Sequence, residues 1–225
     1  MKTYLVNSSA VVIIAAAILA VSTPGALAAG FVCPSGGTPA PGSKVSGGLE
    51  VSPGTCVVNG VTVSGGITVD TGGHLQLQGS TANGGVRVQP GGELDINATT
   101  NGSGIPTGTT ATIHGGITIN NPFDVDIWTA TIDGGITLNG PADGSLPFIC
   151  GNTINGATSF SNVSNTQIGG SGKGGCGGNS FDGTLSLTNS TVLIGGNTIN
   201  GSLLCSNSTV IVLSPNTITG QNTCY

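Results

Sequence analysis

The chain has 225 residues, of which 6% are charged, with 41 glycines, six cysteines and a formal net charge of −5. So few cations exclude a basic surface for nucleic acid or for an anionic membrane, and glycine without a three-residue period excludes a collagen helix. The β-branched residues are plentiful and regularly spaced, which distinguishes the chain from disordered glycine-rich sequences.

The first 28 residues are typical of a secretory signal peptide. Lys2 provides a basic start, residues 11–21 form an apolar run too short to span a bilayer comfortably, and Ala26-Leu27-Ala28 is an A-x-A cleavage site. We therefore expect a secreted protein that has no membrane association after cleavage. The chain from residue 29 onward carries three cations against nine acids, a formal net charge of −6.

A repeat anchored on glycine organises the remaining chain. Its clearest copies read Asn-Thr-Ile-x-Gly, at 152–156, 197–201 and 216–220, and most earlier copies place a Gly-Gly pair before alternating apolar residues. Most steps between copies are 18 or 19 residues, which is the signature of a solenoid. A turn with positive φ, or close backbone approach, explains the repeated glycine. It occupies Gly47, Gly65, Gly84, Gly115, Gly134, Gly156, Gly183, Gly201 and Gly220.

Each repeat contains three short stretches with apolar residues at inward positions. Apolar and polar residues alternate in these stretches, as they do in strands with one buried face. Three strands per coil, joined by Gly, Asn, Pro and Asp turns, describe a parallel β-helix in which stacking buries the apolar face of each coil. We predict an all-β fold, a single right-handed parallel β-helix of about nine coils over 45–225, with an N-terminal cap at 29–44. The pattern sets no register within 139–150 and 161–175.

Two polar columns accompany the predicted third strand of each coil. Asparagine precedes this strand in four successive coils, and stacked asparagines satisfy the backbone groups of neighbouring turns. The ladder consists of Asn152, Asn179, Asn197 and Asn216. The outward position of the strand holds Thr or Ser from Thr62 to Thr217, and regular threonine arrays can bind ice. Threonine is also a common strand residue, and two insertions are expected to interrupt the column, so ice binding is the minor alternative.

All six cysteines lie beyond the signal peptide, which indicates an oxidising compartment and three disulfides. One pair falls at matching positions of adjacent coils and a second at positions that differ by one residue, where the spacing suits a disulfide, and the third pair remains by elimination. The predicted pairs are Cys205 with Cys224, Cys150 with Cys176, and Cys33 with Cys56.

Titratable residues and one tryptophan gather on the outward side of the predicted second strand. The group consists of His74 in one coil, Glu93 and Asp95 in the next, and Asp124, Asp126 and Trp128 in the third. Carboxylates in adjacent coils lie about 5–7 Å apart, which disfavours full ionisation unless a cation lies among them. The four acids are therefore candidate Ca²⁺ ligands, an exposed indole beside polar groups suits sugar stacking, and His74 completes the candidate ligand-binding set. The plainer interpretation is a solvated acidic surface with the indole folded over the coil.

The chain resembles right-handed parallel β-helix proteins of the pectin-lyase-like type over most of 45–225. Its run 197–224, with Cys205-Ser206-Asn207 and the closing Gly220-Gln221-Asn222-Thr223-Cys224, resembles the tails of uncharacterised secreted bacterial proteins. The resemblance implies polysaccharide lyases and hydrolases as the enzymatic alternative. The chain lacks the lyases' basic residue beside calcium-binding acids and the polygalacturonases' paired-Asp motifs, so no catalytic residue is assigned.

The sequence thus favours a secreted, non-enzymatic structural or binding module, with an extracellular polysaccharide or the cell wall as the expected partner. Ca²⁺ is the one cofactor that the residues suggest, and no nucleic acid is expected. The alternative is a calcium-dependent lyase or glycoside hydrolase that uses the four acids. Insertions at 98–109 and 169–178 break the repeat, and solenoids commonly place function at such breaks. The oligomeric state is left open.

Overall fold

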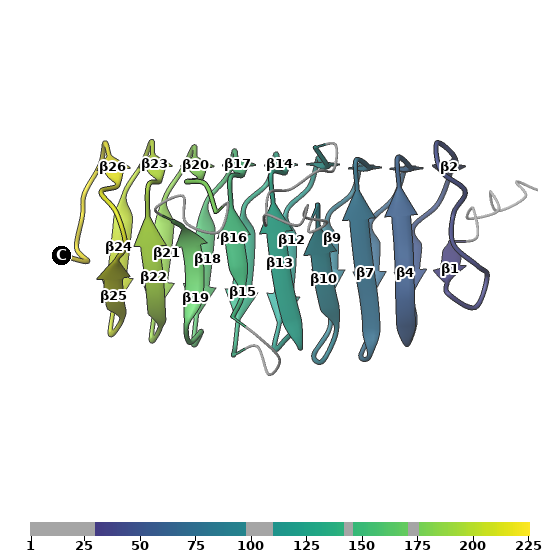
Figure 1. Cartoon of the computed structure of the whole chain (residues 1–225), viewed down its shortest axis with the longest axis horizontal. Coiled ribbons are helices and arrows are strands. Elements are labelled where there is room, and N and C mark those ends of the chain that lie inside the picture. The colour runs from purple at the N-terminus through teal and green to yellow at the C-terminus, as the bar shows by residue number, and fades with distance from the viewer. Residues whose placement is uncertain (1–29, 98–109, 142–145, 171–175) are drawn as a thin grey trace, which may run out of the picture.

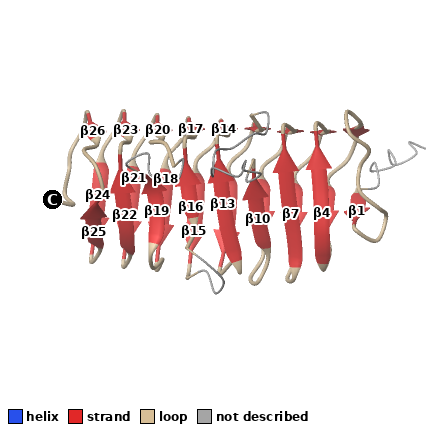
Figure 2. Ribbon diagram, in the orientation of Figure 1, coloured by secondary structure: helices blue, strands red, loops and turns tan. Residues whose placement is uncertain are grey.

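The computed structural model is a parallel β-solenoid (Figure 1), and it describes residues 30–97, 110–141, 146–170 and 176–225. The described residues form strands and turns only (Figure 2), so none of their segments is a helix able to cross a membrane. This confirms the predicted all-β solenoid. The predicted signal peptide, the insertion at 98–109 and residues 171–175 of the second insertion lie outside the described residues.

Successive coils add parallel strands to three sheets that run the length of the molecule. Sheet A consists of β1 (Phe31–Cys33), β3 (Leu49–Val51), β6 (Ile67–Val69), β9 (Val86–Val88), β12 (Ile117–Asn120), β15 (Ile136–Asn139), β18 (Thr158–Ser161), β21 (Leu185–Thr188) and β24 (Leu203–Ser206). Sheet C consists of β4 (Gly54–Asn59), β7 (Gly73–Gln78), β10 (Glu93–Ile96), β13 (Asp124–Trp128), β16 (Phe148–Cys150), β19 (Thr166–Gly169), β22 (Thr191–Gly195) and β25 (Thr209–Val212). Sheet B consists of β2 (Lys44–Val45), β5 (Thr62–Val63), β8 (Thr81–Ala82), β11 (Thr112–Ile113), β14 (Thr131–Ile132), β17 (Thr153–Ile154), β20 (Ser180–Phe181), β23 (Thr198–Ile199) and β26 (Thr217–Ile218).

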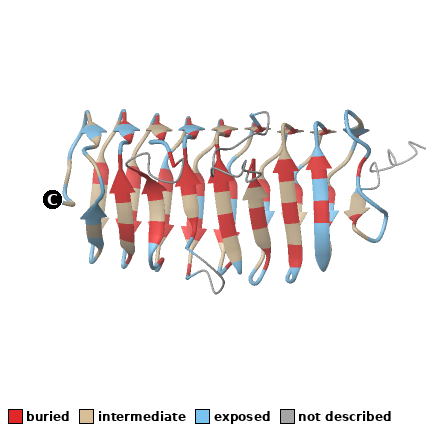
Figure 3. Ribbon diagram, in the orientation of Figure 1, coloured by how far each residue is buried: buried red, intermediate tan, exposed pale blue. Residues whose placement is uncertain are grey.

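The sheets enclose one continuous aliphatic core, and in Figure 3 buried bands alternate with intermediate or exposed bands along the strands. Register stacks like residues on like, so that Ile117 of β12 lies between Val86 of β9 and Ile136 of β15. The core also sets the register that the sequence leaves open, because Ile149 and Ile168 point inward side by side. The last coil departs from the predicted burial: Val212 is 44% exposed because no described strand stacks on β25.

Close backbone approach explains the corner glycines. The N–H of Gly65 donates to the carbonyl of Gly47 at 3.0 Å, so the corners of adjacent coils are in direct contact. A Cβ added to Gly84 would lie 2.5 Å from the backbone nitrogen of Gly66, which is far inside van der Waals contact. Gly84 has no left-handed φ. At this corner the spacing between coils, rather than the turn conformation, selects glycine.

The predicted asparagine ladder forms in the second half of the solenoid. Asn179 Oδ1 accepts from the backbone N–H of Asn152 at 3.0 Å and from Asn152 Nδ2 at 3.0 Å. Asn179 Nδ2 donates in turn to the carbonyl of Ile149 at 2.7 Å and to Asn197 Oδ1 at 2.9 Å. Asn197 makes the equivalent bonds to Asn216. Each amide therefore joins its coil to the preceding one: its Nδ2 donates to a carbonyl of that coil, and its Oδ1 accepts that coil's N–H groups.

All three predicted disulfides are present. Their Cα–Cα distances are 5.6 Å for Cys33–Cys56, 5.1 Å for Cys150–Cys176 and 5.0 Å for Cys205–Cys224. These distances are close to the spacing between coils, so each bridge joins strands or turns already held near one another. Oxidised cysteines are compatible with an extracellular protein.

Candidate cation site on sheet C

Three neighbouring strands of sheet C bring the titratable residues together. Parallel register places Glu93 of β10 directly between His74 of β7 and Asp124 of β13. Asp95 lies between Gln76 and Asp126 in the same way. Insertion 98–109 lengthens the connection from β10 to β13 without separating the two strands, so the cluster predicted from the sequence spans three adjacent rungs.

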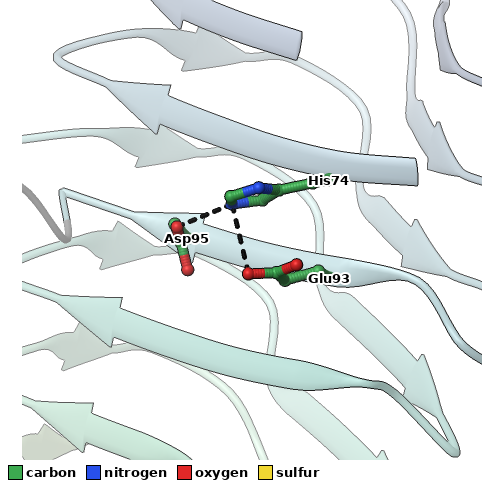
Figure 4. Close-up of side chains that lie close together, drawn as sticks. All are labelled: His74, Glu93 and Asp95. Atoms are coloured by element: carbon green, nitrogen blue, oxygen red, sulfur yellow. Dashed lines mark hydrogen bonds and ion pairs between the residues drawn. The ribbon is translucent and has the colours of Figure 1, made fainter. Parts of the chain in front are cut away.

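His74 is the centre of the closest contacts (Figure 4). Its Nε2 lies 2.7 Å from Asp95 Oδ2 and 3.5 Å from Glu93 Oε1, and the three side chains are 18–27% exposed. One ligand atom from each residue lies within 4.8 Å of the others, a spacing at which one metal ion can bind all three. The imidazole from β7 and both carboxylates from β10 thus point toward one spot on the outer face of the sheet.

Asp126 is the most perturbed acid of the cluster. Its pKa is raised from 3.8 to about 7, first by burial and then by the charges of Asp124 and Asp95, whereas a backbone hydrogen bond from Phe148 opposes the shift. Its Oδ1 is shielded from solvent and has no hydrogen-bond partner among the described residues. A proton or a cation would relieve this carboxylate.

The pKa of Glu93 is also raised. Desolvation raises its pKa, the neighbouring His74 lowers it, and Asp95 and Asp124 raise it again. Asp124 differs because its Oδ1 accepts from the backbone N–H of Val125 at 2.9 Å. The cluster therefore holds four carboxylates against one imidazole, an excess of negative charge that a dication can balance.

Trp128 does not provide the exposed indole expected from its strand position. It follows Asp126 at the outward parity, but it is only 8% exposed. The ring of Phe148 covers it at a centroid distance of 5.9 Å, and both pack with Cys150 and Cys176 in a small cluster on the outside of sheet C. The indole is therefore not available as a stacking platform for a sugar ring.

The second histidine lies elsewhere, on the turn that follows β11. His114 Nδ1 lies 2.7 Å from Asp133 Oδ2, and Asn155 Nδ2 donates to Asp133 Oδ1 at 3.0 Å. The hydrogen bonds from His114 and Asn155 lower the pKa of Asp133. At His114 the amide of Asn155 therefore takes the place that a second carboxylate has beside His74. The side chains of His114 and Asp133 are 48% and 40% exposed.

A hollow of about 430 Å³ is formed by sheet A and its turns, including Glu50, Thr68 and Asp70, and none of the cluster side chains lines it. The titratable cluster instead lies on the outer face of β7, β10 and β13.

Comparisons of the chain with protein-family models, curated proteins and solved structures found no match. The site must therefore be interpreted from its own geometry.

Proposed function

We propose that the protein is a secreted, non-enzymatic binding module that holds a divalent cation on the outer face of β7, β10 and β13. The observation that carries the proposal is that five titratable groups lie on three adjacent rungs, with a solvent-shielded oxygen on Asp126 that has no hydrogen-bond partner within the described part of the chain. Burial and then the neighbouring acids raise the pKa of Asp126 and Glu93, and a cation held by His74, Glu93 and Asp95 would offset the repulsion between these acids. The disulfides and the signal-like leader support secretion.

An anionic extracellular polysaccharide is the partner that such a site would bind, because a cation with open positions accepts further oxygen ligands. The burial of Trp128 removes ring stacking from this proposal and leaves the cation as the main contact. The strands around the cluster are paired on both sides, so the backbone positions that carry the carboxylates are fixed before a cation binds.

Equilibrium dialysis and calorimetric titration with Ca²⁺ or Zn²⁺, on metal-free oxidised protein, test the proposal. We expect stoichiometric binding that raises the melting temperature and weakens in Glu93→Gln and Asp95→Asn. Glu50→Gln, on sheet A, is the matched control and should bind as the natural chain does. Absence of binding to any dication would refute the function. Turnover of polyuronides or neutral glycans that is lost in Asp126→Asn would instead establish the enzymatic alternative.

Ice binding is a second candidate, because the threonine column is more regular than the sequence indicates. The insertions do not interrupt it: register pairs each member directly with the next along sheet B. The column consists of Thr62, Thr81, Thr112, Thr131, Thr153, Ser180, Thr198 and Thr217. Rungs about 4.8 Å apart then present a straight row of hydroxyl groups to solvent.

Thermal hysteresis of the folded protein tests this candidate. If the column binds ice, Thr131→Lys should abolish hysteresis by inserting a long charged side chain in the middle of the row. Thr118→Lys, at an outward position of sheet A, is the matched control and should preserve it. A natural protein that shows no hysteresis would exclude ice binding.

A further inference from the structure

The residues nearest to one another in the cluster are not all oxygen ligands, and this bears on which cation binds. His74 supplies a nitrogen atom at the centre of the site, 2.7 Å from an oxygen of Asp95 and 3.5 Å from an oxygen of Glu93. We propose that His74, Glu93 and Asp95 form a three-ligand site that selects a Zn²⁺-type transition-metal dication over Ca²⁺. The inference rests on the cation binding proposed above and names the class of ion.

The donor atoms of the site favour a Zn²⁺-type ion over Ca²⁺. Ca²⁺ prefers six to eight oxygen ligands, whereas imidazole together with carboxylates is a typical donor set for Zn²⁺ and its neighbours in the first transition row. Here one of the three convergent groups is an imidazole. A site that uses His74 therefore favours the ion for which nitrogen is a good ligand.

The distances from His74 Nε2 to the two carboxylates also suit a Zn²⁺-type ion. Zn²⁺ bonds of about 2.0–2.2 Å in a tetrahedron place neighbouring ligand atoms roughly 3.3–3.6 Å apart. The 3.5 Å separation of His74 Nε2 from Glu93 Oε1 matches that edge length, whereas the 2.7 Å separation from Asp95 Oδ2 is a hydrogen-bond distance that rotation of the Asp95 carboxylate lengthens when an ion binds. The three side chains are 18–27% exposed, which leaves one side of the site open to solvent for a fourth ligand.

The negative charge of the neighbouring carboxylates favours a dication over a neutral ligand. Asp95 is paired in register with Asp126, whose shielded Oδ1 has no hydrogen-bond partner among the residues the structure describes. Two carboxylate ligands neutralise a dication, and the remaining acids on β13 lie on the adjacent rung. A dication at His74 therefore lowers the repulsion across the whole cluster, which a neutral ligand does not do.

The chain contains its own control. Only two histidines occur in the sequence, and His114 has the same 2.7 Å contact to a carboxylate, that of Asp133. The third group there is the amide of Asn155, which donates to Asp133 through Nδ2. His114 thus reproduces the histidine–aspartate pair without the second carboxylate, and we expect it to bind metal poorly.

The experiment is calorimetric titration of the oxidised, full-length folded protein with ZnCl₂ and, separately, CaCl₂. We expect Zn²⁺ to bind with at least about 100-fold higher affinity than Ca²⁺. His74→Ala should lower Zn²⁺ affinity by about 100-fold or more, since loss of an outer-shell partner alone costs about 10–100-fold. Glu93→Gln should also weaken Zn²⁺ binding, and His114→Ala should leave it unchanged. Circular dichroism confirms that each variant is folded.

Nuclear magnetic resonance of the two imidazoles gives a readout that a merely structural role would not move. Zn²⁺ should shift the ring nitrogens of His74 and leave those of His114 in place. Ca²⁺ binding that equals or exceeds Zn²⁺ binding, with no effect of His74→Ala on either, would overturn the selectivity and leave the proposed cation binding intact. Failure of both ions to bind would overturn the proposed function as well.

Discussion

Replacement of Asp126 by asparagine gives a direct test of the electrostatics of sheet C. Folding raises the pKa of this carboxyl from 3.8 to about 7, mainly through burial. The folded protein therefore holds the proton more tightly than the unfolded chain does. The carboxyl imposes no penalty below pH 3.8, and stability is lost progressively as the pH rises from there to about 7.

The magnitude follows from the size of the shift. A rise in pKa from 3.8 to about 7 corresponds to about 4 kcal/mol of lost stability at pH 8, and partial solvation makes about 2–4 kcal/mol the expected range. Asparagine carries no charge at any of these pH values. Its one amide oxygen can take the place of the carboxylate oxygen that accepts from the Phe148 backbone, and its Nδ2 can then donate to a neighbouring carboxylate such as Asp95. Asp126→Asn should therefore stabilise the protein at pH 8 by about 2–4 kcal/mol.

Urea unfolding in the presence of EDTA, followed by circular dichroism between pH 4 and pH 8, measures the effect. The stabilisation by Asp126→Asn should shrink steadily toward pH 4. Asp133→Asn is a control of opposite sign, because hydrogen bonds from His114 and Asn155 lower the pKa of Asp133. That variant should be less stable than the natural chain throughout pH 4 to pH 8, and the difference should be lost only in a further series below pH 3.8. Equal destabilisation by Asp126→Asn at every pH would refute the reasoning.

Two further predictions concern the scaffold. Asn179→Ala should cost about 2–4 kcal/mol in denaturant unfolding, because it removes the acceptor of the Asn152 backbone N–H and a donor to the Ile149 carbonyl, whereas the exposed Asn200→Ala should change stability little. Loss of the Cys150–Cys176 disulfide by paired serine substitution should raise the fluorescence of the single tryptophan, which packs against that bridge, whereas loss of the C-terminal disulfide should leave the emission unchanged. An unchanged spectrum in the first variant would contradict the observed packing.

The fold is predictable from the sequence because two independent patterns agree. The corner glycine sets the length of a coil, and alternation within strands sets which residues point inward, so the pairing of Ile117 with Ile136 follows from the repeat alone. The disulfides and the asparagine ladder follow once the repeats are aligned on the corner glycine. The aligned repeats do not predict the strand register where inward positions are polar. Thr158 and Thr166 are buried at positions that hold aliphatic residues in other coils. Without an apolar marker, alternation gives no register there.

Trp128 shows a second limit of sequence reasoning. Its parity correctly places the indole on the outside of sheet C, yet outward does not mean exposed. Phe148 occupies the adjacent rung, and the bridge from Cys150 to Cys176 covers the remaining side. Both contacts depend on the register of β16, which lies in a stretch where the sequence pattern is ambiguous. Exposure at an outward position therefore depends on the neighbouring coils, which the residue's own strand does not reveal.

The titratable cluster could be located from the sequence because it lies on regular strands. Register fixes which rungs meet, so Glu93 beside both His74 and Asp124 follows from the frame alone. The frame gives no side-chain rotamers, and so it could not show that Nε2 of His74 turns toward both carboxylates of β10. Such a concentration of acids opposes folding, and the continuous core and ladder hydrogen bonds offset it. A rigid solenoid can thus hold like charges in a fixed geometry, which is the condition for selecting one cation over another.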